Sequence, residues 1–186
     1  MDKCTIYYRR FLDGDEYAFD DLMKELFRSL VFFIYGYVHN VHVAEDIAMD
    51  AFSDLIINKK RYNFKVTLKT YLFMIGKSRA LDHIKRGKII DFVDLSEAQN
   101  MKDDEEKLIE IVLADERKIR VNNAMSKLPE DMRAAVHLVF FEEMTYEEAA
   151  KVMKKNRKQI DNLLFRAKKE LRAILENTMK SYNARK

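Results

Sequence analysis

Cationic and aromatic side chains are interleaved between Asn58 and Thr67, a stretch that contains no acidic residue. Aromatic rings stack on unpaired bases and cations bind phosphates, so this combination is typical of surfaces that hold single-stranded nucleic acid. The basic character continues to Lys88, against a single acidic residue, Asp82. The side chains that we expect to contact nucleic acid in this block are Lys59, Lys60, Arg61, Tyr62, Phe64, Lys65, Lys77, Lys85 and Arg86.

An acidic ladder lies just before the basic block. Asp46, Asp50 and Asp54 recur at every fourth position, Glu45 lies beside them, and neither Lys nor Arg occurs in residues 41–57. Like charges one helical turn apart repel each other by about 0.2–0.5 kcal/mol. The ladder is therefore either a solvated helix face, which the pattern alone favours, or a docking face for a basic partner.

A helix-turn-helix is predicted near the C-terminus. Thr145 and Glu148 form a capping box for a short helix, and a break at 154–156 separates that helix from a long basic helix over 157–175. In such a unit the second helix lies in the major groove with its N-terminal side chains against base edges. The candidate base readers are Arg157, Lys158, Gln159, Asp161, Asn162 and Arg166. The alternative is an ordinary helical hairpin with a basic solvent face.

The composition predicts that these groups are carried on helices. With Gly 4 and Pro 1, residues that interrupt helices are scarce, while 48% hydrophobic and 35% charged residues are enough for a core and a soluble exterior. Apolar residues recur every three or four positions over 17–38, 43–58 and 68–86, and an apolar helix is expected over 134–141. We therefore predict an all-α fold.

An acidic segment with no sustained apolar period follows the first basic block, from Asp94 to Glu106. This pattern predicts a linker over residues 93–115. Two small helical domains, residues 1–92 and 116–186, are expected on either side of it. Each domain carries one basic surface, which favours two contacts with a long polyanion.

Several classes of protein are disfavoured by the sequence. It has no run of about 18 uncharged apolar residues and no signal-peptide pattern, which predicts a cytoplasmic protein without direct membrane insertion. Cys4 is the single cysteine, and we expect a free thiol without a structural role. A metal-dependent hydrolase is the enzyme alternative, but His42 and Asp46 are its only ligand-like helical pair. No metal, cofactor or catalytic residue is expected.

Four motifs occur in the order seen in the sigma-70 family. They comprise residues 14–19, residues 44–52, residues 71–75 with 81–86, and Leu128-Pro129 followed by 145–150 and 165–172. Because the chain has room for only two sigma domains, it resembles more narrowly the extracytoplasmic-function (ECF) subgroup. The resemblance covers nearly the whole chain. It implies a non-enzymatic transcription initiation factor with a region 2-like helical bundle and a region 4-like helix-turn-helix.

The resemblance also implies a partner for each group of residues. The helix over 44–56 is similar to the segment that docks on the clamp helices of core RNA polymerase, which implies polymerase contacts from Glu45, Asp46, Asp50, Phe52 and Asp54. The block over 58–88 is implied to recognise and melt the −10 promoter element, with flipped bases held in the loop over 58–67. The helix-turn-helix is implied to read the −35 element and to touch the polymerase flap.

Some positions depart from the family pattern. The turn usually has Gly where Lys154 stands, and the recognition helix often has Thr and Arg where Gln159 and Leu163 stand. These departures affect which promoter is read rather than the class. The resemblance also admits an inhibitory anti-sigma partner, although no residue specifies one. The alternative function is a free-standing helix-turn-helix transcriptional regulator, which would leave the acidic ladder and the basic aromatic loop unexplained.

Overall fold

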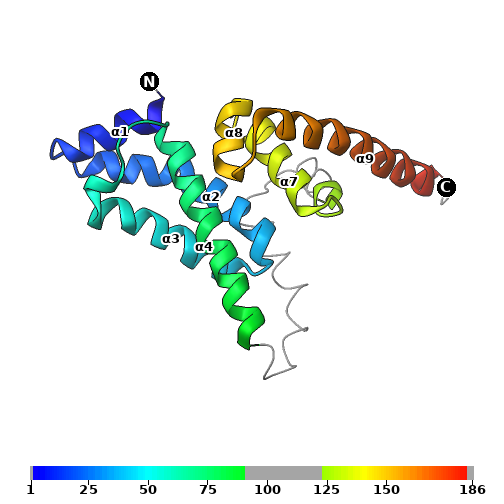
Figure 1. Ribbon diagram of the computed structural model, residues 1–186, viewed down its shortest axis with the longest axis horizontal. Helices are drawn as coiled ribbons and strands as arrows, with labels where there is room; N and C mark the ends of the chain where they lie inside the picture. Colours follow the sequence, from blue (N-terminus) through cyan, green and yellow to red (C-terminus); the bar gives the residue numbers. More distant parts are fainter. Residues whose placement is uncertain (1, 91–122, 184–186) are drawn as a thin grey trace. The chain divides into compact units, whose positions relative to one another are not determined.

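The computed structural model describes residues 2–90 and 123–183, and every regular element within these ranges is a helix. The chain divides into two compact units, Met1–Val112 and Leu113–Lys186, which can be followed by colour in Figure 1. The all-α prediction with two helical domains is confirmed. The predicted linker over 93–115 lies outside the described residues, so the domain bounds stay a prediction. No helix in the described ranges is long and apolar enough to span a membrane.

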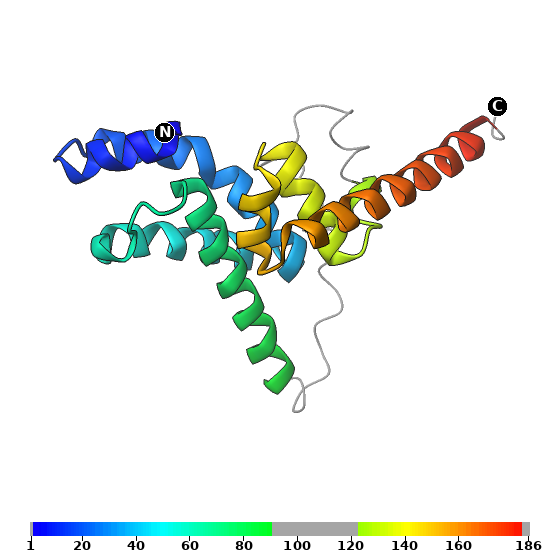
Figure 2. The same ribbon diagram turned by 45° about the horizontal axis from the view of Figure 1, so that its top comes forward.

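The first unit contains α1 (Lys3–Leu12), α2 (Tyr17–Val38), α3 (Val41–Ile57), the short 3-10 helix η1 (Lys59–Arg61) and α4 (Leu68–Ile90). Helix α2 lies at the centre and packs against α1, α3 and α4, as Figures 1 and 2 show. Its predicted apolar stripe is mostly buried between Phe19 and Tyr37, whereas Tyr17 at its start is 81% exposed. Helix α3 begins at Val41 because the Asn40 side chain accepts a hydrogen bond from the Val43 backbone N–H at 3.0 Å.

At Gly76, α4 packs tightly against side chains of α2. A Cβ atom added there would lie 2.9 Å from Leu30 Cδ1 and 3.1 Å from Ile34 Cδ1. Both side chains are fully buried, so neither can move into solvent. We expect Gly76→Val to lower the free energy of unfolding by about 1–3 kcal/mol, because overpacking a dense core forces strained rotamers or backbone shifts.

Urea unfolding followed by circular dichroism measures this effect. Gly87→Val is the matched control, because Gly87 lies on the same helix with nothing within 4 Å of the added Cβ. Equal effects of the two substitutions on stability would contradict the packing argument.

Helix α1 was not predicted from the sequence. Asp2 caps it by accepting a hydrogen bond from the Thr5 backbone N–H at 3.1 Å. Its buried face consists of Cys4, Thr5 and Tyr8, and the Tyr8 hydroxyl donates to the Leu55 backbone carbonyl at 2.8 Å. The expectation that Cys4 has no structural role was wrong, because the residue is 5% exposed and belongs to the core.

Burial changes the chemistry of the Cys4 thiol. Desolvation, with a smaller contribution from the Asp2 charge, raises the pKa of Cys4 from 9.0 to about 12. The thiolate is the nucleophile, so we expect the native protein to react with iodoacetamide at pH 8 far more slowly than the protein unfolded in urea. Because the unfolded thiol loses its proton first, the free energy of unfolding should decrease as the pH rises above 9.0. Equal alkylation rates of native and unfolded protein would contradict the burial of Cys4.

The second unit contains α7 (Glu130–Val136), the π-helical turn η2 (His137–Phe141), α8 (Tyr146–Met153) and α9 (Arg157–Asn183). Its core forms where Ile160, Leu164 and Ala167 of α9 are buried together with apolar side chains of α7 and α8. The continuous helix predicted over 134–141 is corrected, because the Glu142 N–H donates to the His137 carbonyl at 3.1 Å and widens the last turn. The predicted capping box at Thr145 and Glu148 is confirmed.

Candidate functional site

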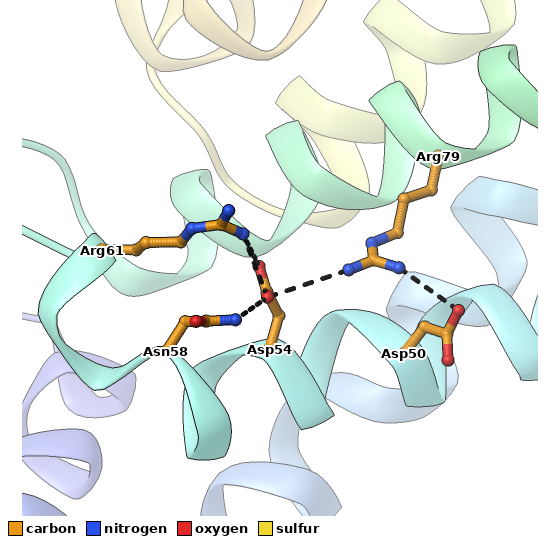
Figure 3. A network of polar contacts seen from close by, with 5 residues as sticks. All are labelled: Asp50, Asp54, Asn58, Arg61 and Arg79. Atoms are coloured by element: carbon orange, nitrogen blue, oxygen red, sulfur yellow. Dashed lines mark hydrogen bonds and ion pairs between the residues drawn. The ribbon is translucent and has the colours of Figure 1, made fainter.

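The acidic ladder on α3 is partly neutralised from within the chain, by arginines of η1 and α4. Arg79 Nη1 lies 3.2 Å from Asp50 Oδ2, and its Nη2 lies 4.0 Å from Asp54 Oδ1. Asp54 Oδ1 also accepts hydrogen bonds from Arg61 Nη1 at 3.2 Å and Asn58 Nδ2 at 2.6 Å. Figure 3 shows this network, in which Asp54 is the common acceptor.

Exposure divides the ladder into two parts. The Asp54 side chain is 12% exposed, whereas the Asp50 side chain is 67% exposed and Asp46 is also exposed. Asp54 therefore holds η1 and α4 against the end of α3, while Asp46 and Asp50 present charge to solvent. Glu45 is half-buried, and its Oε2 lies 3.7 Å from His42 Nδ1.

Apolar side chains share the exposed face of α3 with these two carboxylates. Met49 is 49% exposed and Ile57 is 77% exposed. Their spacing from Asp46 and Asp50 places all four residues on one side of the helix. We call Asp46, Met49, Asp50 and Ile57 the α3 face. Met49 and Ile57 were not among the residues expected from the sequence to contact the polymerase.

Phe52 does not belong to this face. It is 1% exposed, and its ring packs 6.1 Å from Phe19 and 6.2 Å from Phe27, measured between ring centroids. The expectation that Phe52 contacts a partner directly is corrected, because its side chain fills the core between α2 and α3.

A polar groove of about 280 Å³ lies between α3 and α4. It is lined by carboxylates, cations and two aliphatic side chains: Val43, Asp46, Ile47, Asp50, Arg79, Asp82, His83 and Arg86. Arg86, one of the expected nucleic-acid contacts, thus borders the acidic face of the neighbouring helix. Among the residues described, no group of three or more His, Cys, Asp or Glu side chains could hold a metal ion.

The basic aromatic loop before α4 is built around a buried tyrosine. Tyr62 is 4% exposed, and its hydroxyl donates to the Val66 backbone carbonyl at 2.7 Å. Its ring centroid lies 5.7 Å from that of Tyr8 and 5.0 Å from that of Tyr71. Tyr62 therefore orders the loop, and the expectation that it stacks on a base is corrected.

Unlike the buried Tyr62, Phe64 and the loop cations are exposed. Phe64 is 39% exposed and has φ +60°, a backbone conformation that bulky residues rarely adopt. Lys59, Lys60, Arg61 and Lys65 are exposed, as are Lys85 and Arg86 on α4. The expectation that Lys77 contacts nucleic acid is corrected, because Lys77 is 9% exposed and its Nζ lies 6.0 Å from the centroid of the Tyr37 ring. Exposed cations are thus present in η1, in the loop and on α4.

The second unit has the helix-turn-helix geometry. Helix α8 ends at Met153, and the φ of +53° at its C-cap Lys154 explains why glycine suits this position. Helix α9 begins with a reciprocal cap, in which the Asn156 N–H donates to Gln159 Oε1 and the Gln159 N–H donates to Asn156 Oδ1, both at 2.8 Å. All six candidate readers on α9 are exposed. Arg157 is also held by Glu147 at 3.1 Å.

Aromatic side chains on the second unit were missed by the sequence reading. Phe165 is 73% exposed and follows Asp161 and Asn162 by one helical turn, so it lies among the candidate readers. Phe140 and Phe141 of η2 are 51% and 49% exposed, and Lys168 Nζ lies 5.3 Å from the Phe140 ring centroid. Phe140 and Phe141 lie in the π-helical turn, which no local sequence signal predicted.

Comparison with known proteins gives consistent matches in both units. Residues 22–89 match the family described as Sigma-70 region 2, and residues 118–171 match Sigma-70, region 4. The RNA polymerase sigma-H factor of Pseudomonas aeruginosa is 27% identical over 171 residues, covering 88% of this chain and 89% of that protein. The ECF RNA polymerase sigma factor SigM of Bacillus subtilis is 25% identical, covering 83% and 93% respectively.

Solved structures share the fold. CnrH, solved in complex with the cytosolic domain of CnrY, gives a TM-score of 0.65 at 19% identity and covers 95% of this chain and 99% of that one. The sigma factor RpoE of Bartonella quintana, solved with the anti-sigma factor NepR, gives 0.62 at 20% identity and covers 85% and 96%.

Two helical units that match sigma regions 2 and 4 in that order define a class of transcription factor, and the chain belongs to the sigma-70 family. Its similarity to SigM and SigW, both ECF sigma factors, places it in the ECF group of that family.

Proposed function

We propose that the chain binds core RNA polymerase through the first unit and directs the enzyme to promoters by reading −35 and −10 DNA. The observation that carries the proposal is the separation of three surfaces on two units: an acidic and apolar face on α3, a basic loop with an exposed phenylalanine, and an exposed reading face on α9. A regulator that only bound duplex DNA would need the third surface alone.

The α3 face is the proposed polymerase-docking surface. Interfaces combine a desolvated apolar centre with charges that select the partner, and Met49 and Ile57 beside Asp46 and Asp50 supply both. A basic partner surface fits this charge. Asp54 supports the α3 face indirectly, through its ion pairs with Arg61 and Arg79.

The loop before α4 is the proposed −10 surface. Opening duplex DNA costs about 1.4 kcal/mol of stacking per base step, and stacking on an aromatic side chain recovers about 1–3 kcal/mol per captured base. Phe64 is the exposed ring available for such stacking, and Lys59, Lys60 and Lys65 are placed to bind phosphates. The loop would thus stabilise the melted strand after the polymerase has been positioned.

Helix α9 is the proposed −35 reader. Gln159 and Asn162 suit adenine, and Arg157, Lys158 and Arg166 suit guanine or phosphate. Phe165 is added to this set, because an exposed ring among readers can contact the thymine methyl group. The exposed Phe140 and Phe141 are the proposed contact with the polymerase flap, since paired exposed aromatic side chains favour protein association.

We further propose that the protein is a cytoplasmic factor that catalyses no reaction itself and leaves nucleotidyl transfer to the polymerase. An inhibitory anti-sigma factor is included as a partner, on the basis of the family and of the complex in which RpoE was solved.

A binding experiment tests the proposal against the free-standing regulator. A library of double-stranded promoter fragments is incubated with the protein alone, with core polymerase alone and with both. Specific fragments should be retained only when protein and polymerase are combined. Specific retention by the protein alone, unchanged by the polymerase, would support the regulator and contradict the proposed function.

A further inference from the structure

An arginine of α1 lies against the exposed aromatic ring of the basic loop. Arg9 Cζ is 4.9 Å from the centroid of the Phe64 ring, within the range of a cation–π contact. Arg9 is exposed, and within the described ranges it forms no ion pair. The next residue, Arg10, does form an ion pair, because its Nη2 lies 2.6 Å from Asp15 Oδ2. Of these two adjacent arginines, Arg9 is the one directed at the loop.

The position of Arg9 is fixed by buried bonds on the same helix. The adjacent Tyr8 is fully buried and donates its hydroxyl to the Leu55 carbonyl at 2.8 Å. One turn earlier, Thr5 Oγ1 accepts a hydrogen bond from the Leu68 N–H at 3.0 Å. Helix α1 is therefore attached both to the end of α3 and to the start of α4, on either side of the loop. Figures 1 and 2 show the loop passing α1 between these two helices.

The loop in turn holds Phe64 in an unfavourable backbone conformation. Its φ of +60° persists between two local restraints, the Tyr62 hydroxyl bound to the Val66 carbonyl at 2.7 Å and the Asn63 Oδ1 bound to the Lys65 N–H at 3.1 Å. Strained backbone of this kind is concentrated at sites that bind ligands. The result is a ring packed 4.5 Å from Tyr62, between centroids, yet 39% exposed to solvent.

We propose that Arg9 and Phe64 together form the platform that holds one unpaired base of the melted DNA strand. A planar guanidinium can stack on a base while its N–H groups bind the adjoining phosphate, which a lysine cannot do. Lys59, held 4.6 Å from the Phe11 ring centroid, adds a second cation next to α1. This inference rests on the proposed −10 function of the loop. It extends the DNA-binding surface to α1, which precedes the region 2 match at residues 22–89.

Strand binding by the assembled holoenzyme tests the platform. The probe is a fluorescein-labelled, mixed-sequence single-stranded DNA of about 20 nucleotides, and the readout is its anisotropy at several salt concentrations. From the usual contribution of one stacked base, Arg9→Gln should weaken binding by about 5- to 20-fold. Arg9→Lys should keep the salt dependence but lose most of the affinity. Arg10→Gln is the matched control and should change binding by less than about 2-fold, in line with the small contribution of an exposed charge.

A double substitution separates the shared platform from two independent contacts. In the Phe64→Ala background, Arg9→Gln should have little further effect, because the base has already lost its support. Circular dichroism of every variant checks the fold.

Three results would overturn the inference. If Phe64→Ala weakened binding but Arg9→Gln left it unchanged, Arg9 would not belong to the site, while the proposed −10 function would stand. Wild-type affinity in Arg9→Lys would show that Arg9 acts only as a point charge and does not stack on the base. No single-strand binding by the wild-type holoenzyme would overturn both this inference and the −10 assignment.

Discussion

Charge reversal on the α3 face, Asp46→Lys with Asp50→Lys, is expected to weaken binding to core RNA polymerase by about 100-fold or more. Both carboxylates are exposed, so a basic partner surface would lose two attractions and meet two like charges, each costing several kcal/mol once desolvated. The fold should survive, because the Asp50–Arg79 pair is largely exposed and contributes at most about 1 kcal/mol. Binding is measured by anisotropy of the labelled protein titrated with core polymerase.

Two further variants identify the cause of that loss. Asp13→Lys with Asp20→Lys makes the same change in net charge at exposed positions of the first unit and should leave binding nearly unchanged. Asp54→Asn should mainly lower stability, since Asp54 is 12% exposed and accepts from Arg61 and Asn58. Unchanged binding in the Asp46 and Asp50 double variant, with its circular dichroism intact, would remove the α3 face from the polymerase interface.

Substitution of Gln159 is expected to change which −35 sequences are preferred. The Gln159 carbonyl caps α9 by accepting from the Asn156 N–H, which leaves its NH₂ group to donate to a base. Gln159→Glu keeps the cap acceptor and removes the donor, so it should lose about 1–3 kcal/mol of discrimination at one or two positions. Gln159→Ala should lose the same discrimination and, in addition, about 0.5–1.5 kcal/mol of stability, the usual net contribution of one hydrogen bond such as that from the Asn156 N–H.

Relative rather than absolute affinity is the appropriate readout for Gln159, because a new negative charge repels every DNA. Holoenzyme is allowed to select from a library randomised at the −35 element, and the bound fraction is sequenced. Lys158→Gln serves as the comparison, and it should weaken binding to all sequences about equally. An equally uniform loss in both Gln159 variants would contradict base reading by this side chain.

Features specified by neighbours in sequence were predictable. The stripes of α2, α3 and α4 follow from the helical period, and the start of α8 follows from Thr145 and Glu148, whose reciprocal bonds close within one turn. The basic character of the loop and the exposure of the α9 readers were also evident from composition. In each case the deciding interactions lie within a few residues of one another.

Features decided by tertiary contacts were not predictable. Helix α1 is short, and the role of its buried residues is set only by contacts with the ends of α3 and α4. Asp54 cannot be told apart from Asp46 and Asp50 in the sequence, yet its side chain is 12% exposed and accepts hydrogen bonds from Asn58 and Arg61. Tyr62 and Phe64 are two positions apart in a polar loop, yet one is buried by Tyr8 and Tyr71 while the other is exposed by a positive φ. No periodic pattern carries that distinction.

Run-off transcription with sigma-free core polymerase would show whether the protein directs promoter-specific initiation. Core enzyme is incubated with a promoter library in the presence or absence of the purified protein, and transcripts are sequenced to locate their start sites. We expect initiation from a defined subset of templates only when the protein is present, with shared sequence elements near −35 and −10. No protein-dependent transcripts and no complex with core polymerase, together with specific duplex binding by the protein alone, would contradict it.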